Sequence, residues 1–103
     1  MNFNEYQEEA AKTAVYSNEF YPFASLMIES AELADLVAKP VLRGDEKEID
    51  RFDIVAEAGD VLWNLAMCLE EHNVSLQSVA EYNIRKLKSR AERGVLMGSG
   101  GDR

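Results

Sequence analysis

The sequence predicts an all-helical protein, a four-helix bundle, and three observations support this class. Apolar residues recur at helical spacing, four helical segments follow one another through short connections, and no segment alternates as a strand would. A chain of 103 residues with an apolar fraction of 47% has room for one domain with a single core.

The first two helices are predicted from their caps and prolines. Residues 3–15 form the first helix, with Asn2 or Asn4 as its N-cap. Residues 22–38 form the second, because a proline suits the first turn of a helix. Pro40 is expected to end this helix, since the residue before a proline is disfavoured in helical geometry.

The third helix is predicted to open at Gly44 and Asp45 and to reach about Glu71, a length of roughly 40 Å. Asp45 and Glu48 have the spacing of a capping box. A break is expected at His72, at the end of this helix.

The fourth helix is predicted to follow Ser75 as its cap, to reach about Glu92 and to end at Gly94. Residues 1–94 are therefore expected to form one helical domain. Residues 95–103 are rich in glycine and are expected to form a flexible tail that becomes ordered on binding.

Composition excludes several functional classes. A net charge of −8 argues against a general nucleic-acid binder, because a polyanion would be repelled. The lone Cys68 excludes a disulfide framework within the chain and favours a reducing, cytoplasmic setting. The acidic N-terminus is not expected to be a signal peptide, and no apolar run is long enough to span a membrane.

The charges are unevenly distributed along the chain. Sixteen of the 19 acidic residues precede His72, and six of the 11 basic residues lie from Arg85 onward. An acidic body with a basic C-terminal helix could hold a cation and a phosphate chain together. Solvated helix faces are the alternative explanation.

Carboxylates fall inside the apolar stripe of the second predicted helix. At 100° per residue, Glu29 lies among leucines, and Glu32 lies about 60° away. An ionised carboxylate buried without a partner is unfavourable, or its pKa rises. A solvated face would place these residues on the opposite side of the helix.

The third predicted helix repeats this arrangement. Asp53, Glu57, Asp60 and Asn64 share a strip about 60° wide, with apolar residues on both sides. Two such strips on packed helices would bring several carboxylates around one point. Like charges this close repel unless a cation lies among them.

Oxygen ligands favour a hard cation, and the lack of an EF-hand loop favours Mg²⁺ or Mn²⁺ over Ca²⁺. A di-iron bundle would need Glu-x-x-His motifs on two helices, and the only histidine, His72, has no glutamate three residues before it. Acids bridged to lysine or arginine are the alternative to a metal site.

The fourth predicted helix carries complementary residues. Asn83, Lys86 and Arg90 share one face. Cations in the last turn favour the helix dipole, which alone would explain Arg90 but not Lys86 in mid-helix. A divalent cation opposite such donors is the usual equipment for phosphoryl transfer.

Four segments resemble the MazG-like nucleotide pyrophosphohydrolases of the all-alpha NTP pyrophosphatase superfamily, especially the short phage and bacterial forms. They are NEYQEEAAKTAVY, ESAELAD, EAGDVLWNLA and NIRKLKSRAERGVLMGSGGDR. The chain departs from the family at Ile28, where a further glutamate is frequent. It also departs in the tail, where an acidic-Asn-Arg ending is more usual.

The resemblance implies a metal site and a reaction. Glu29, Glu32, Glu57 and Asp60 would be the metal ligands and catalytic residues, with Mg²⁺ as the cofactor. The phosphate contacts would come from Asn83, Lys86 and Arg90. Family members cleave a nucleoside triphosphate, often a deoxynucleotide, to the monophosphate and pyrophosphate, in nucleotide-pool cleansing or phage nucleotide metabolism.

The resemblance also implies a homodimer, or a homotetramer of paired dimers, with sites near the subunit interfaces. Helices apolar over more than half their circumference suit such pairing. Trp63 lies beside the acidic strip and is a candidate for stacking on the base, although an aromatic at helical spacing is more often part of a core. Weaker candidates for contact with the base or substrate are Phe20, Tyr21, Phe23, Tyr6 and Lys12.

Three alternatives remain open. The first is a helical dimer that binds nucleotides with a metal but does not hydrolyse them. The second is a purely structural helical protein with buried ion pairs. The third is pyrophosphohydrolysis of phosphoribosyl-ATP within the same superfamily.

Overall fold

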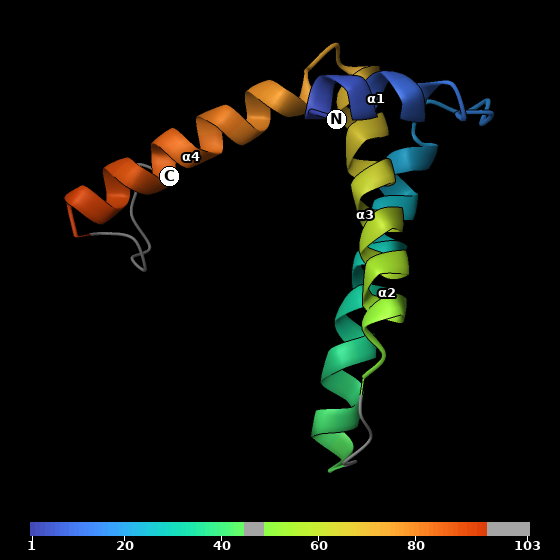
Figure 1. Cartoon of the computed structure of the whole chain (residues 1–103). Helices are drawn as coiled ribbons and strands as arrows, with labels where there is room; N and C mark the ends of the chain where they lie inside the picture. The colour runs from blue at the N-terminus through green and yellow to red at the C-terminus, as the bar shows by residue number, and fades with distance from the viewer. Residues whose placement is uncertain (45–48, 95–103) are drawn as a thin grey trace.

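The computed structural model describes residues 1–44 and 49–94. These ranges contain four helices and no strand, which confirms the all-helical class. The helices are α1 (Phe3–Ala11), α2 (Tyr21–Arg43), α3 (Arg51–Glu71) and α4 (Leu76–Glu92) (Figure 1).

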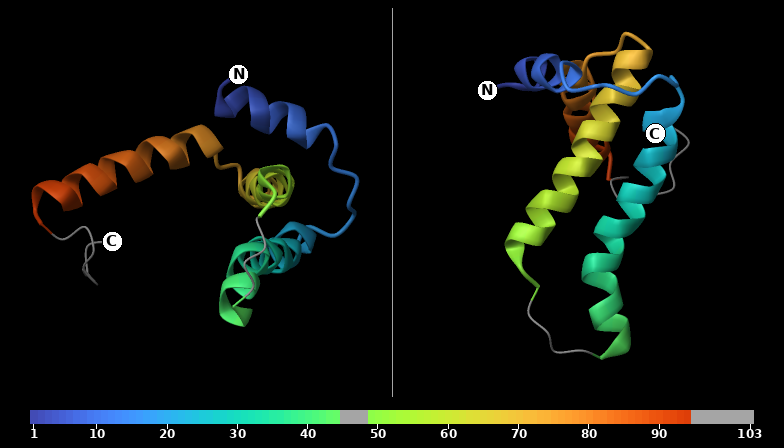
Figure 2. Two further views of the ribbon diagram at one scale, coloured as in Figure 1. Left: turned by 60° about the horizontal axis from the view of Figure 1, so that its bottom comes forward. Right: turned by 90° about the vertical axis from the view of Figure 1, so that its right-hand side faces the viewer.

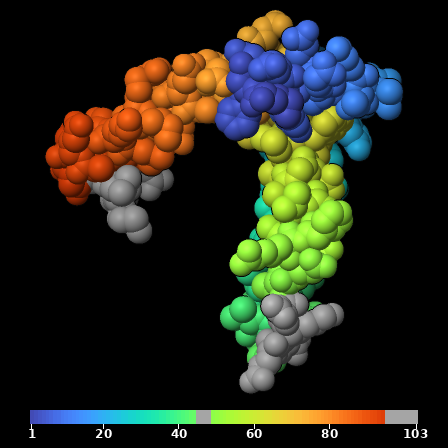
Figure 3. All heavy atoms as spheres, in the orientation of Figure 1, coloured from blue at the N-terminus to red at the C-terminus, as the bar shows by residue number. Residues whose placement is uncertain are grey.

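Two long antiparallel helices, α2 and α3, form a hairpin, and α1 packs across one end of it (Figures 1 and 2). The last helix, α4, packs against α1 and then leads away from the hairpin. Figure 3 shows it as an arm that stands off from the rest of the molecule. The four helices therefore do not close into a bundle within one chain.

The first helix begins as expected but ends early. Asn2 caps it with a capping box, because its side chain accepts from the Glu5 amide at 2.8 Å and its own amide donates to Glu5 at 3.0 Å. The predicted continuation to residue 15 is wrong. The Thr13 hydroxyl donates to the Ala10 carbonyl at 2.7 Å and accepts from Trp63 at 2.8 Å. This tertiary contact holds the chain in a turn.

The second helix is longer than predicted. Pro22 lies in its first turn, as expected, but the helix continues through Pro40 to Arg43. The predicted end at Pro40 is wrong: α2 continues three residues beyond this proline, which cannot donate to the carbonyl of residue 36 and so weakens the helix without ending it. Gly44, at φ 72°, ends the helix by donating its amide to the Pro40 and Val41 carbonyls.

The third helix begins after Asp50, whose side chain accepts from the Phe52 amide at 2.9 Å. It does not begin at Gly44, which caps α2 instead. The predicted capping box of Asp45 and Glu48 lies outside the described residues.

The end of the third helix and the bounds of the fourth agree with the predictions. The third helix ends at Glu71. Ser75 caps α4 through its Oγ atom, which accepts from the Ser78 amide at 3.1 Å. Gly94 follows the last residues of this helix at φ 71°.

The core is small and lies where α1 meets α3 and the start of α4. Its buried apolar residues are Ala10, Ala66, Met67, Cys68 and Leu76. Gln7, only 5% exposed, connects these elements: its Nε2 atom donates to the Val74 carbonyl, and its Oε1 atom accepts from the Leu76 amide. Within residues 1–44 and 49–94, no helix combines the length and the apolar character that crossing a bilayer requires.

Candidate metal centre

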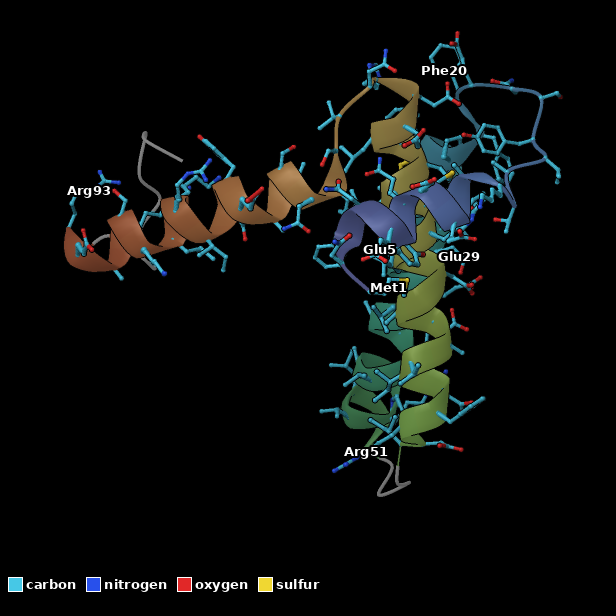
Figure 4. All side chains as sticks on the ribbon, turned by 45° about the horizontal axis from the view of Figure 1, so that its top comes forward. Met1, Glu5, Phe20, Glu29, Arg51 and Arg93 are labelled. Carbon is cyan, nitrogen blue, oxygen red and sulfur yellow. The ribbon has the colours of Figure 1, made fainter. Side chains whose placement is uncertain are left out.

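Three carboxylates converge where α2 faces α3. Glu29 of α2 and Glu57 and Asp60 of α3 each offer one oxygen, and these oxygens all lie within 4.8 Å of one another. The spacing of three residues places Glu57 and Asp60 on one face of α3. The apolar stripe of α2 places Glu29 on the side of that helix that faces α3, and Figure 4 labels its place along the hairpin. We call this region the acid seam.

Glu32 belongs to the same electrostatic cluster. Its side chain is exposed, and its negative charge raises the pKa of both Glu29 and Glu57. Its carboxylate is not among the three whose oxygens converge within 4.8 Å. The structure thus brings three of the four predicted ligands together and leaves Glu32 outside that group.

The surroundings of Glu29 and Glu57 in the acid seam disfavour the negative charge of an ionised carboxylate. Burial is the main cause that raises the pKa of Glu29 and of Glu57, and the charges of neighbouring acids raise both further. The Oε2 atom of each glutamate is buried without a hydrogen-bond partner. Neither oxygen is neutralised by a cation of the described chain.

Ion pairs lie elsewhere in the described ranges. Lys39 pairs with Asp35 at 3.0 Å and Lys12 pairs with Glu9 at 2.9 Å, all four side chains being largely exposed. The alternative of acids bridged to lysine or arginine is therefore not supported at Glu29 or Glu57.

The acid seam fits a hard divalent cation. Its converging donors are all carboxylate oxygens, which Mg²⁺ and Mn²⁺ prefer. Two of the glutamates keep a buried oxygen that accepts nothing from the protein. A cation would supply the positive charge that these groups lack.

The predicted phosphate-binding residues all lie on α4, away from the acid seam of the same chain. Asn83 is exposed, and Lys86 and Arg90 are half-buried. The Lys86 ammonium lies over the Tyr82 ring, 5.9 Å from its centroid. The Nε and Nη2 atoms of Arg90 are buried without a hydrogen-bond partner.

Trp63 lies beside a cavity next to the hairpin. Its indole Nε1 atom donates to Thr13, and its ring meets the Tyr16 ring edge to face at 6.2 Å. Tyr16 also stacks on Tyr21 at 5.6 Å. These side chains, with Val15, Ser17 and Asn18, line a cavity of about 450 Å³.

The weaker candidates do not gather at one site, although Phe20 and Phe23 line one cavity together with His72. Phe20 is 68% exposed, whereas Phe23 packs against the His72 ring at 5.6 Å. Tyr6 packs against the core, and Lys12 pairs with Glu9. Sequence reasoning missed Tyr16, because its contact with Trp63 joins positions that are far apart in the chain.

An all-helical fold with a cluster of carboxylates that could hold a metal ion points to a class of protein, and comparisons place the chain within it. The family model of the MazG nucleotide pyrophosphohydrolase domain matches residues 22–95. The chain belongs to this family, whose members are typically metal-dependent.

A relative from a phage supports the assignment. "Gene 37 protein" of Mycobacterium phage L5 is 36% identical over 115 aligned positions, which cover all of both chains. No solved structure matches the chain.

Proposed function

We propose that the protein hydrolyses nucleoside triphosphates, including deoxynucleotides, to the monophosphate and pyrophosphate with Mg²⁺, for which Mn²⁺ can substitute. The observation that carries this proposal is the convergence of the Glu29, Glu57 and Asp60 carboxylates, together with the buried oxygen without a partner on each of the two glutamates. Its setting is nucleotide-pool cleansing or phage nucleotide metabolism.

In this proposal, Glu29, Glu57 and Asp60 hold the cation and Glu32 completes the ligand set. When bound, the cation neutralises triphosphate charge and activates the attacking water. The carboxylates fix its place on two rigid helices, so the triphosphate is oriented with little reorganisation at the moment of reaction.

The phosphate contacts require a second copy of the chain. Asn83, Lys86 and Arg90 lie on α4, which leads away from the acid seam of its own chain. We therefore assign them to the site of a partner in a homodimer, or in a homotetramer of paired dimers. Each α4 would supply positive charge to the carboxylates of the other subunit.

The surface of the chain supports this pairing. Large apolar side chains remain exposed on the hairpin, among them Met27 at 72%, Val41 at 70% and Phe52 at 76%. A second copy would remove such surface from water.

The base would enter the cavity beside Trp63. Its aromatic lining suits a flat ring, and Trp63 is three residues from Asp60 on α3. A triphosphate held at the acid seam would then have its base near the start of α2.

The test is pyrophosphate release from a panel of ordinary and modified dNTPs, with Mg²⁺ and with excess chelator. Glu57→Gln should lower turnover by at least about 100-fold, because the ligand set loses a charge. Asp35→Asn is the matched control, since Asp35 is an exposed acid of α2 that pairs with Lys39. It should retain wild-type turnover.

Full activity in excess chelator would overturn the proposal. Tight nucleotide binding without turnover would assign the chain to the non-catalytic alternative instead. Selective cleavage of phosphoribosyl-ATP, included in the same panel, would assign it to that reaction.

A further inference from the structure

Asn64 of α3 is a buried amide whose oxygen has no partner. The residue is 4% exposed, and its Nδ2 atom donates to the Asp60 carbonyl at 2.8 Å. Because a carbonyl can only accept, the nitrogen must be the atom that faces it. The Oδ1 atom is therefore the one left buried without a hydrogen-bond partner.

The other buried side-chain amide of the described chain has a partner for both its nitrogen and its oxygen. Gln7 uses its nitrogen toward the Val74 carbonyl and its oxygen toward the Leu76 amide. Gln7 thus has a structural role that its contacts explain. The contacts of Asn64 explain no such structural role. An apolar residue at this mid-helix position would avoid the cost of a buried oxygen without a partner.

The position of Asn64 relates it to the acid seam. It follows Asp60 by four residues and Glu57 by seven, so the three side chains lie on one strip of α3. The buried oxygens without partners on α2 and α3 are Glu29 Oε2, Glu57 Oε2 and Asn64 Oδ1. All three are acceptors, so one source of positive charge and hydrogen-bond donors would satisfy them together.

We propose that Asn64 is a positioning residue of the metal centre, whose side-chain oxygen accepts a hydrogen bond from a water in the hydration shell of the cation. This rests on the cation of the proposed function. A small divalent cation such as Mg²⁺ keeps several waters when it binds through carboxylates. Those waters are donors, and Asn64 offers the neutral acceptor one turn beyond Asp60.

The test compares Asn64→Leu, which keeps the size but removes the acceptor, with Asn64→Asp, which keeps an oxygen. Mn²⁺ binding to the nucleotide-free protein is measured by titration calorimetry, and thermal unfolding is measured in chelator. Asn64→Leu should weaken Mn²⁺ binding about 10- to 100-fold. Its Tm in chelator should stay level or rise, because the unpaired oxygen is gone.

Asn64→Asp should bind Mn²⁺ at least as tightly as wild type. Gln7→Leu is the matched control and should do the reverse of Asn64→Leu, lowering the Tm while leaving Mn²⁺ affinity unchanged. Asn64→Ala also removes the acceptor and serves if leucine disturbs the helix packing.

The proposal is overturned if Asn64→Leu and Asn64→Ala both bind Mn²⁺ with wild-type affinity. This holds even if these variants have a lower Tm or a changed preference among bases. So would a wild-type protein that binds no Mn²⁺ without nucleotide. If wild type binds Mn²⁺ but hydrolyses no nucleotide, the proposed function fails, and the variants still decide the role of Asn64.

Discussion

Two regions of the molecule differ in how completely their polar side chains find hydrogen-bond partners. Near α1, Gln7 and Thr13 have partners for both donor and acceptor, and Trp63 donates its indole N–H to Thr13. In the acid seam, Glu29 and Glu57 each keep a buried oxygen that nothing in the protein satisfies. Unpaired buried acceptors are unfavourable in a folded chain, so their concentration distinguishes the functional region from the region that holds the helices together.

The largest expected effect is on turnover, and it tests whether α4 of a partner subunit supplies the phosphate contacts at the acid seam. Glu57→Gln and Lys86→Ala are each expected to be nearly inactive as homodimers. A heterodimer of the two, purified through different tags, should recover about half of wild-type turnover, because one of its two sites then has an intact seam and an intact partner α4.

No recovery in that heterodimer would contradict the assignment of α4 to the partner's site. Asp35→Asn paired with Lys86→Ala provides the control. Its exposed acid lies outside the seam, so this heterodimer should also recover about half of wild-type turnover.

The next effect concerns the region near α1. Gln7→Leu would leave the Val74 carbonyl and the Leu76 amide without their partners, at a cost of about 2–4 kcal/mol in the free energy of unfolding. Urea unfolding measures this change. Glu57→Gln in chelator should instead be as stable as wild type or more so, since it removes a repelled charge from the seam. If Glu57→Gln lost as much stability as Gln7→Leu, the two regions would not differ in the way described.

The smallest effect is a pH dependence confined to the seam. The pKa values of Glu29 and Glu57 are raised above the ordinary value of 4.5, so the folded chain holds these protons more tightly than the unfolded chain. The stabilisation is present below pH 4.5 and is lost as the pH rises through the raised pKa values. In chelator, the Tm should therefore fall over this range relative to Glu57→Gln.

Added Mg²⁺ should reverse this trend, because it binds the deprotonated carboxylates and only the folded chain presents them together. Thermal melts at a series of pH values, with chelator or with Mg²⁺, measure both curves. If wild type and Glu57→Gln gave identical curves of Tm against pH, the acid seam would not be the source of the pH dependence.

Capping residues in the sequence correctly predicted those helix boundaries that a cap sets by itself. Asn2 and Ser75 act as the N-caps of α1 and α4, and Gly94 follows the end of α4, as their residue types indicate. The predictions failed where tertiary contacts or position within the helix overrode the local preference. Trp63 holds Thr13 in a turn, and α2 continues past Pro40 to its C-cap, Gly44.

The sequence by itself determined the helical class and which acids share a helix face, because both follow from a period of 3.6 residues. It also pointed to Glu29 and Glu57 as costly positions for a charge. Only the tertiary structure decided that Glu29, Glu57 and Asp60 converge, that Asn64 keeps an unpaired oxygen, and that α4 leads away from them. The convergence of the carboxylates depends on how α2 and α3 align, and the place of α4 depends on its packing against α1. The periodicity of a single helix encodes neither arrangement.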